Sequence, residues 1–369
     1  MKIISMLVQE FINEIENLAP RAYAEGFDNT GLLVGDPKME ITNVLVTLDT
    51  LESVVDEAIQ KNCNTILSFH PIIFSGLKKI NGNNYVERVV IKAIKNDIAI
   101  YAIHTALDNS FDGVNAKICD ILEVKNRSVL IPQSGTIKKL TTFVPKDNAK
   151  ELREHLFNAG AGAIGNYSHC SFNVEGTGTF MGNEFSNPAK GEKNSVHYEN
   201  EVQIGVVFSK HHEKKLIKTL INKHPYEEVA YEISTLENTD KRIGMGMIGE
   251  LETAIDERDF LKIIKERMKA DMIRHSALLN KEIKKVAVLG GSGAFAIENA
   301  KNAGADLFLT SDVKYHQFFQ AENQLIIADI GHFETEQFTK NLLVEYLNKK
   351  IHNFAIILSD SNTNPIKYF

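Results

Sequence analysis

The sequence of 369 residues has no tryptophan and only three cysteines, Cys63, Cys119 and Cys170. These cysteines are far apart, odd in number and form no Cys-x-x-Cys pair, which excludes a disulfide framework or a thiolate zinc knuckle and fits a reducing compartment. No apolar run reaches the roughly 18 residues that a membrane-spanning helix needs. The N-terminus has one lysine, a brief apolar stretch and then acidic residues, which does not match a signal peptide. We therefore expect a cytoplasmic protein with no membrane partner.

Basic residues are in deficit, with 41 lysines and arginines against 48 aspartates and glutamates and a net charge of −7. This balance argues against a general affinity for the nucleic-acid backbone, so we do not expect a nucleic-acid partner. The hydrophobic fraction of 43% and the charged fraction of 24% are those of an ordinary soluble globular protein. The length allows two domains and a large buried core.

Strand and helix patterns alternate along the first 124 residues. Apolar residues recur at helical spacing in Val8–Leu18, Leu51–Lys61 and Tyr85–Lys95, and Thr50 is available to cap the second of these helices. Strand patterns lie between them, and the same alternation resumes from about residue 257, with a long helix over Glu334–Leu347. This rhythm predicts an α/β fold of right-handed βαβ units, with a mainly parallel sheet in the first region and mixed or parallel sheets for the domain as a whole.

The pattern changes in the middle of the chain. Elements there are expected in the order strand, helix, glycine-rich segment, strand, helix and strand, at Lys138–Val144, Ala149–Ala159, residues 160–178, Val202–Phe208, Glu213–Lys223 and Val229–Ile233. This β-α-β…β-α-β order is typical of a compact ferredoxin-like α+β module. Its two ends, near residues 125–136 and 236–247, are polar and rich in turn residues. We predict an inserted domain over residues 128–240 that interrupts an α/β domain formed by residues 1–127 and 241–369.

Two motifs in the predicted insertion are distinctive, Glu175-Gly-Thr-Gly-Thr-Phe180 and His224-Pro-Tyr-Glu-Glu228. The glycines are expected to permit positive φ angles in a bend. Nothing in the residue types of either motif implies chemistry.

Histidines and carboxylates directly follow three of the predicted strands. They are, in chain order, His70 after one strand, His104 and Asp108 after the next, and His332 with Glu336 after a strand that ends at Ala328. His332 and Glu336 are four residues apart, so a helix that begins there places both on one face. Because ligands bind outside the carboxyl ends of the strands in a parallel sheet, we expect all five side chains to reach one rim.

Three imidazoles and two carboxylates without a thiolate suit a divalent metal such as Zn, Mn, Fe or Co. Five ligands exceed what a single catalytic zinc usually takes from protein, and they are enough for two ions about 4 Å apart bridged by a carboxylate and a water. Each group also has a simpler interpretation. His332 and Glu336 would then be an exposed pair at a helix start, His70 a turn cap, and His104 a satisfied core histidine.

A glycine-rich turn supplies a rival hypothesis. Gly291, Ser292 and Gly293 separate a predicted strand from a helix beginning at Ala294, and free amides at such a helix start suit a phosphate. Gly291–Ala296 also matches the G-x-G-x-x-A dinucleotide fingerprint, which would make the protein an oxidoreductase. A tight strand-to-helix turn needs glycines in any case.

A further polar group follows the strand predicted at residues 306–310. It consists of Asp312, Lys314 and His316. These side chains are candidates for orienting metal ligands, contacting substrate or transferring protons, and His316 is the candidate catalytic acid.

Several of these stretches together resemble the Nif-three-like family, whose members are often catalogued as GTP cyclohydrolase 1 type 2 homologues. They are Gly26–Leu32, His70–Phe74, His104–Asp108, Gly304–His316 and Gly331–Glu336. The middle of the chain, including His224–Tyr231, is similar to the PII/CutA-like insertion of the longer bacterial members. The resemblance implies two α/β lobes that form a metal-bearing domain, the insertion between them, and a toroidal homohexamer built as a trimer of dimers. It also implies a dinuclear site with the ligands His70, His104, Asp108, His332 and Glu336.

One position departs from the family pattern. Two adjacent histidines usually precede the proline, and here the first of them is Phe69, which cannot bind a metal. We therefore expect one or two ions per subunit, with one metal position weaker, completed by water, or empty.

The leading hypothesis is a metal-dependent hydrolase in which the ion activates a water and Glu336 or Asp108 takes its proton. The family name suggests attack on C8 of the guanine of GTP, and a phosphoester is an alternative target. The second hypothesis is a metal-binding, ligand-sensing scaffold that is not an enzyme.

Overall fold

The computed structural model describes residues 5–369 and divides into two compact units. The first unit comprises the chain up to Pro132 and from Lys241 onward, and Gln133–Asp240 form the second, here called the inserted unit. The prediction that the N-terminus does not match a signal peptide rests in part on residues 1–4, which lie outside the described residues. Within residues 5–369, no helix combines the length and the apolar character needed to cross a membrane.

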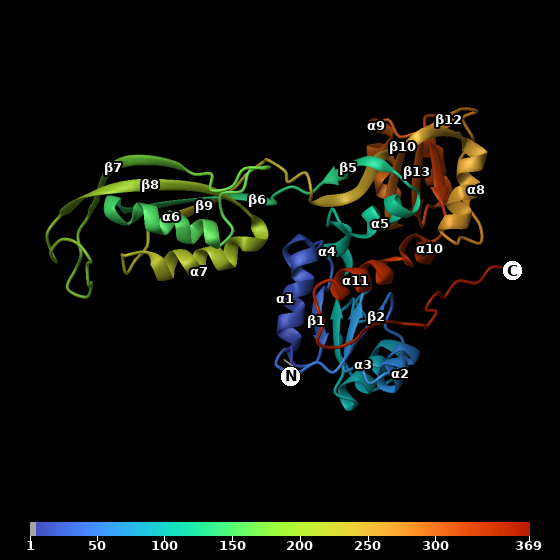
Figure 1. Cartoon of the computed structure of the whole chain (residues 1–369), viewed down its shortest axis with the longest axis horizontal. Coiled ribbons are helices and arrows are strands. Elements are labelled where there is room, and N and C mark those ends of the chain that lie inside the picture. Colours follow the sequence, from blue (N-terminus) through green and yellow to red (C-terminus); the bar gives the residue numbers. More distant parts are fainter. Residues whose placement is uncertain (1–4) are drawn as a thin grey trace. The chain divides into compact units, whose positions relative to one another are not determined.

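The first unit contains two sheets. One has the strand order β1-β4-β3-β2-β15, in which β1 alone is antiparallel to its neighbour. The strands are β1 (Gly31–Val34), β2 (Val44–Thr47), β3 (Thr65–Ser68), β4 (Ala99–Ala102) and β15 (Ile356–Leu358). Helices α2 (Glu52–Gln60) and α3 (Tyr85–Lys95) pack against this sheet through a buried cluster that includes Val54, Ile66 and Val89 (Figure 1). Their apolar spacing puts these side chains on one face of each helix.

The second sheet has the order β11-β14-β13-β12-β10-β5 and mixes parallel and antiparallel strands. The strands are β5 (Lys125–Pro132), β10 (Gly244–Asp256), β11 (Arg274–His275), β12 (Glu282–Ser292), β13 (Leu307–Ser311) and β14 (Ile326–Asp329). Only β12, β13 and β14 run parallel, so a mainly parallel arrangement describes the first sheet but not this one.

Two of its strands lie where the sequence predicted polar domain boundaries. β5 has four exposed positions among its eight residues, and such an edge strand lacks a continuous apolar pattern. The boundary expected at residue 128 therefore falls inside β5, and the inserted unit begins five residues later, at Gln133.

One hydrophobic core joins the two sheets of the first unit. It contains side chains from the helices α1 (Val8–Leu18), α5 (Val114–Ile121), α8 (Glu257–Arg267) and α11 (Thr339–Asn348). Leu67 of β3 and Val286 of β12 belong to this same core, and both are fully buried. The two sheets are therefore lobes of a single packed body.

Two local expectations for helices are wrong. Thr50 does not cap α2, because Leu51 occupies the N-cap position and the buried Thr50 hydroxyl has no hydrogen-bond partner within the described chain. The single helix expected over Glu334–Leu347 is two helices, α10 (His332–Glu336) and α11. Apolar periodicity continues across the junction, so the pattern does not reveal the break.

The inserted unit has the element order β6-α6-β7-β8-α7-β9 and an antiparallel sheet with the strand order β7-β8-β6-β9. The elements are β6 (Ile137–Pro145), α6 (Ala149–Asn158), β7 (Phe172–Phe180), β8 (His197–Ser209), α7 (Glu213–Lys223) and β9 (Tyr231–Thr235). Both helices lie on one face of the sheet (Figure 1), and their leucines pack on it.

The bend expected at Glu175–Phe180 is wrong, because these residues belong to the edge strand β7. Neither Gly176 nor Gly178 has a positive φ. A Cβ added at Gly178 would collide with the Glu201 carboxylate on the neighbouring β8, so this glycine provides space across the sheet.

Candidate metal centre

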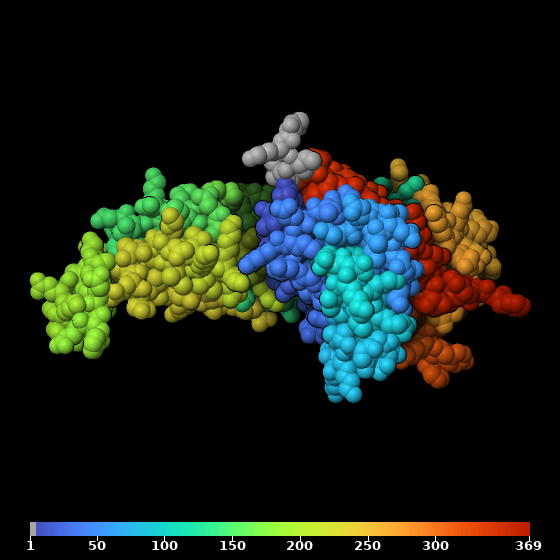
Figure 2. All heavy atoms as spheres, turned by 90° about the horizontal axis from the view of Figure 1, so that it is seen from below, coloured from blue at the N-terminus to red at the C-terminus, as the bar shows by residue number. Residues whose placement is uncertain are grey.

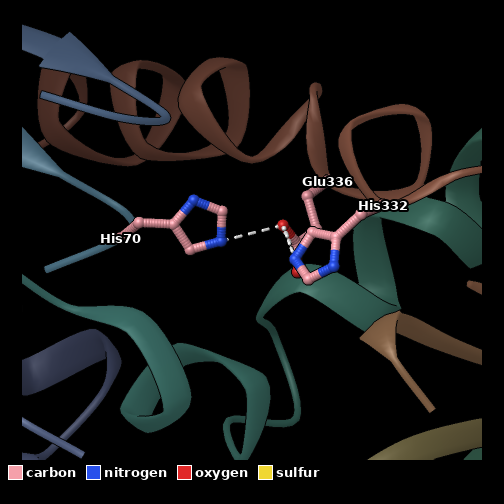
Figure 3. A group of neighbouring side chains, drawn as sticks. All are labelled: His70, His332 and Glu336. Carbon is pink, nitrogen blue, oxygen red and sulfur yellow. Dashed lines mark ion pairs between the residues drawn. The ribbon is translucent and has the colours of Figure 1, made fainter. Parts of the chain in front are cut away.

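Three side chains of the first unit converge on one point. The Nε2 atom of His70 lies 3.0 Å from Oε2 of Glu336, and Nε2 of His332 lies 3.2 Å from the same oxygen. Figure 3 shows His70 reaching the Glu336 carboxylate from the first lobe, while His332 and Glu336 both project from α10. The potential ligand atoms of these three residues all lie within 4.8 Å of one another. Two imidazole nitrogens and a carboxylate oxygen at these separations fit a single divalent cation.

The five predicted ligands do not come from one rim of one sheet. His70 follows β3, and the segment with His104 and Asp108 follows β4, both in the first sheet, whereas His332 and Glu336 follow β14 in the second. The expectation of a single rim is therefore wrong. The carboxyl ends of strands from two lobes face one another, and the shared core fixes their separation.

Each of the three histidines has its Nδ1 atom held by an aspartate. The pairs are His70 with Asp49 at 2.8 Å, His104 with Asp28 at 2.8 Å, and His332 with Asp312 at 2.7 Å. An ionised carboxylate only accepts hydrogen bonds, so each Nδ1 carries the proton and donates. A neutral ring held in this way presents the lone pair of Nε2, as in the carboxylate–histidine–metal arrangement of many metal sites.

Two residues of these pairs adopt a backbone conformation that side chains usually avoid. His104 has a φ of +31° and Asp312 a φ of +56°. Left-handed backbone at a residue other than glycine has a free-energy cost, and such residues concentrate at functional sites. Here the strained backbone accompanies the placement of one ring and of one orienting carboxylate.

Asp108 is buried beside this group, and its carboxyl group lacks a compensating partner in the described part of the chain. Its Oδ1 atom has no hydrogen-bond partner among the described residues. Burial raises the pKa of Asp108 well above its usual range, and the nearby charge of Glu336 adds to this effect. A bound cation would relieve both costs, so the residues present fit a divalent metal.

The charges of the three converging residues are strongly coupled. Burial disfavours protonation of His70, but hydrogen bonds to Asp49 and Glu336 outweigh burial and raise its pKa to about 10. The same balance raises the pKa of His332 to about 9 through Glu336 and Asp312. Burial opposes ionisation of Glu336, yet the two imidazoles lower its pKa to about 2. Without an ion, two imidazolium groups therefore compensate the Glu336 carboxylate.

Phe69 packs against both histidines of the first lobe, whose own rings also touch, with centroids 5.3 Å apart. Its ring is fully buried, with its centroid 4.9 Å from that of His70 and 5.5 Å from that of His104. His104 and Asp108 instead line an adjoining cavity of about 240 Å³, together with His332 and Glu336. The structure thus separates the five predicted ligands into a compact group of three and a neighbouring pair.

Phenylalanines form much of the wall of this cavity. Phe27, Phe74 and Phe295 line it, and each of these rings is more than half exposed. No lysine or arginine occurs among its described lining residues. The sequence analysis did not single out these rings, since exposed phenylalanines carry no spacing signal.

The glycines near residue 291 bring backbone close to the metal group. Gly291 has a φ of +70°, and a Cβ there would collide with the Glu336 carboxylate. Its amide donates to the Thr335 hydroxyl, and its carbonyl accepts from Ser311. The Gly291 amide is thus engaged inside the protein and does not support a phosphate loop. Binding of a phosphate by Ser292 and Gly293 stays a prediction.

Of the polar group after β13, only Asp312 reaches the centre through a contact that the structure describes. His316 is exposed and its ring lies against Tyr315 and Phe319, with centroids 5.1 and 6.2 Å away. Lys314 is exposed at the start of the same 3₁₀ segment. The geometry therefore supplies no support for His316 as a catalytic acid.

Asp28 and Asp49 were not assigned a role from the sequence. Asp49 directly follows a predicted strand, so the rule that found His70 also points to it. Its second carboxylate oxygen accepts from the hydroxyl of Thr363 at 2.6 Å. Thr363, near the C-terminus, thereby holds the Asp49 carboxylate in position, and Asp49 in turn holds the His70 ring.

These features define a class: an α/β protein of two lobes with an aspartate-supported histidine–carboxylate centre between them, interrupted by a separate α+β unit. Comparison with known proteins agrees with this class. The chain belongs to the Duf34/NIF3 (NGG1p interacting factor 3) family, whose model matches residues 6–365.

Similar proteins cover the whole chain. A Bacillus subtilis protein named GTP cyclohydrolase 1 type 2 homolog is 38% identical, over 98% of both chains. A protein of the same name from Staphylococcus epidermidis is 33% identical, over 98% of this chain and all of its own. The crystal structure of a Bacillus cereus protein related to NIF3 superposes with a TM-score of 0.83 at 37% identity, covering 100% of both chains.

The aspartates that hold the histidines are expected to control metal affinity. Replacing Asp49 or Asp312 by alanine frees the ring of His70 or His332, and loss of such a partner typically weakens metal binding about 10–100-fold. Zinc competition with a chromogenic chelator measures the effect. Asp259→Ala, which removes an exposed aspartate of α8, is the matched control. Unchanged affinity in both site variants would contradict the assignment.

Metal binding is expected to release protons. His70 and His332, with pKa values raised to about 10 and 9, are protonated at neutral pH without an ion, and only neutral imidazoles bind a metal. Apparent affinity should therefore rise with pH, by about 100-fold per unit for two protons, until the pH approaches 9. Calorimetry of zinc binding in buffers of different ionisation enthalpy counts the protons, and a count of zero at pH 7 would refute the coupling.

Proposed function

We propose that this protein is a metal-dependent hydrolase. The observation that carries the proposal is the convergence of two aspartate-held imidazoles and a buried carboxylate within 4.8 Å, beside the unpartnered carboxyl oxygen of Asp108. His70, His332 and Glu336 would hold one divalent ion, chosen among Zn, Mn, Fe and Co. His104 and Asp108 would serve a second, weaker position, so that each subunit holds one or two ions.

A divalent ion supplies acidification of water and polarisation of a substrate oxygen. The protein's own groups would then orient the reactants and carry the proton. Asp108 lines the cavity, and burial raises the pKa of its carboxyl well above the usual range, which makes it the stronger base of the two carboxylates. Glu336 is the other carboxylate at the centre, and its low pKa makes it the weaker base.

The cavity wall favours a flat ring as the reacting group. Phe27, Phe74 and Phe295 offer apolar surfaces on which a purine can stack. The absence of lysine and arginine among the described lining residues leaves only the ions to bind phosphate, which argues for a nucleobase over a phosphoester. The name of the relatives suggests opening of the guanine ring of GTP, and we propose this as the first substrate to test. A phosphoesterase is the alternative.

A non-enzymatic role is the second candidate. Phe69 stands where the family pattern places a histidine, and its buried ring adds no ligand between His70 and His104. A centre reduced to one strong ion suits a metal-binding or ligand-sensing scaffold. We further propose, on the family resemblance, that the inserted unit is a ferredoxin-like module of the PII/CutA kind and that the protein is a cytoplasmic toroidal homohexamer, a trimer of dimers. Sedimentation equilibrium tests this assembly.

Turnover should depend on His332. If zinc- or manganese-loaded protein opens the GTP ring, as followed by absorbance, His332→Ala should reduce this turnover to background, because Glu336 loses a partner and the ion a ligand. Released formate would report hydrolysis of the resulting formamide by a second water. His352→Ala, which removes an exposed histidine of the same unit, is the control. Metal binding without turnover of GTP or of a phosphoester would favour the scaffold.

Metal content should depend on Phe69. Elemental analysis of protein purified without chelator or affinity tag is expected to give about one ion per subunit. The Phe69→His variant should approach two, because it adds a donor between His70 and His104. Phe69→Leu removes the ring without adding a donor and should stay at one. Two ions in the unaltered protein would show that Phe69 is accommodated, and none in any variant would refute the site.

A further inference from the structure

The inserted unit has a cavity of its own, lined entirely by residues of that unit. Its volume is about 390 Å³, within the range of small-molecule sites in proteins. Strands β6, β7 and β8 contribute to its wall, together with the turn before β9 and the segment 181–196 between β7 and β8. Figure 2 shows the yellow-green end of the inserted unit, where this segment is exposed.

Two motifs without an assigned role meet at this cavity. Glu175–Phe180 supplies the Phe180 ring, and His224–Glu228 supplies Tyr226, Glu227 and Glu228. The Phe180 and Tyr226 rings lie with centroids 5.6 Å apart at an interplanar angle of 62°. Both distinctive stretches therefore contribute aromatic or acidic groups to one wall.

His224 fixes the position of this wall. Its Nδ1 atom accepts from the amide of Tyr226 at 3.1 Å, so the proton lies on Nε2, which donates to the carbonyl of Phe143 at 2.9 Å. The side chain is buried, and burial lowers its pKa, which keeps the ring neutral. Phe143 and Tyr226, two aromatic members of the wall, are thereby tied to each other.

The charge of the cavity wall has one sign. Glu201, Glu227 and Glu228 line it, and no lysine or arginine is found among its described lining residues. The Tyr226 hydroxyl donates to Glu201 at 2.8 Å, and the amide of Asn187 donates to Glu227 at 2.7 Å, so two carboxylates have fixed positions. Glu228 is exposed, and its carboxylate makes no hydrogen bond or ion pair within the described chain.

We propose that this cavity is a second ligand site, which binds a small organic cation consisting of a protonated amine on a flat apolar body. The ammonium group would be attracted by the three carboxylates and by the faces of Phe180 and Tyr226, both of which favour positive charge. The body would fill the apolar part of the wall, formed by Phe143, Met181 and Pro188. An anion of the same shape would be repelled.

The test uses the full-length protein and three probes of matched shape: 2-phenylethylamine, 2-phenylethanol and 3-phenylpropionate. Calorimetry and ligand-observed NMR measure binding up to millimolar concentrations. The amine should bind at least about ten times more tightly than the alcohol or the acid, as expected for a charge-assisted contact. Equal binding of all three probes, or of none, would overturn the proposal.

Matched variants locate the site. Glu228→Gln should weaken binding of the amine several-fold, and Glu228→Lys should abolish it, with unchanged melting temperatures because this carboxylate is exposed. Glu232→Gln, which removes an exposed charge of β9 that does not line the cavity, should bind the amine normally. His332→Ala should also bind it normally, and loss of binding there would place the amine at the metal centre and refute this site. Full affinity in Glu228→Lys would refute it as well.

Discussion

The first unit buries two carboxylates close to each other, and the arrangement of the candidate centre depends on how their charges are compensated. Glu336 and Asp108 are removed from water, and their charges oppose one another. Leaving a buried carboxylate ionised without a partner is among the largest costs a folded protein can carry. Two imidazoles compensate Glu336, while Asp108 is left with a raised pKa. A divalent cation would relieve this imbalance for the whole group, so these residues form a candidate metal-binding group.

The imidazoles can compensate the Glu336 charge only if their rings are held in position, and hydrogen bonds to three aspartates hold them. Asp28, Asp49 and Asp312 fix one nitrogen of each histidine and leave the other for a ligand. Asp49 is in turn held by Thr363, so the segment near the C-terminus supports the position of His70. The preceding residues Ser359 and Ser361 are anchored by hydrogen bonds to the buried Glu57. Geometry at the metal centre therefore rests on packing across both lobes.

The inserted unit also groups carboxylates together, but it packs them less closely than the first unit does. Its carboxylates Glu201, Glu227 and Glu228 line a cavity of about 390 Å³ whose wall also contains aromatic rings. The candidate metal centre instead brings its potential ligand atoms within 4.8 Å of one another. The two groups of carboxylates thus differ in how closely they are packed.

The sequence determined much of the local structure. The bounds predicted for α1, α3 and α7 agree with those observed, because amphipathic spacing is a property of a short window and survives in any tertiary context. The four-residue spacing of His332 and Glu336 likewise placed both on one helical face, as α10 shows. The mixed α/β character followed from the same alternation.

Tertiary structure decided the rest. The partners of His70, His104 and His332 lie 21, 76 and 20 residues away, and no local pattern says which aspartate pairs with which histidine. The meeting of strands from two sheets depends on a core shared by both lobes, and the strands β5 and β7 form because neighbouring strands pair with them. Periodicity records which face of an element is buried, but not which element covers it. The residue types alone therefore suggested a metal, and only long-range packing decided which donors stand together.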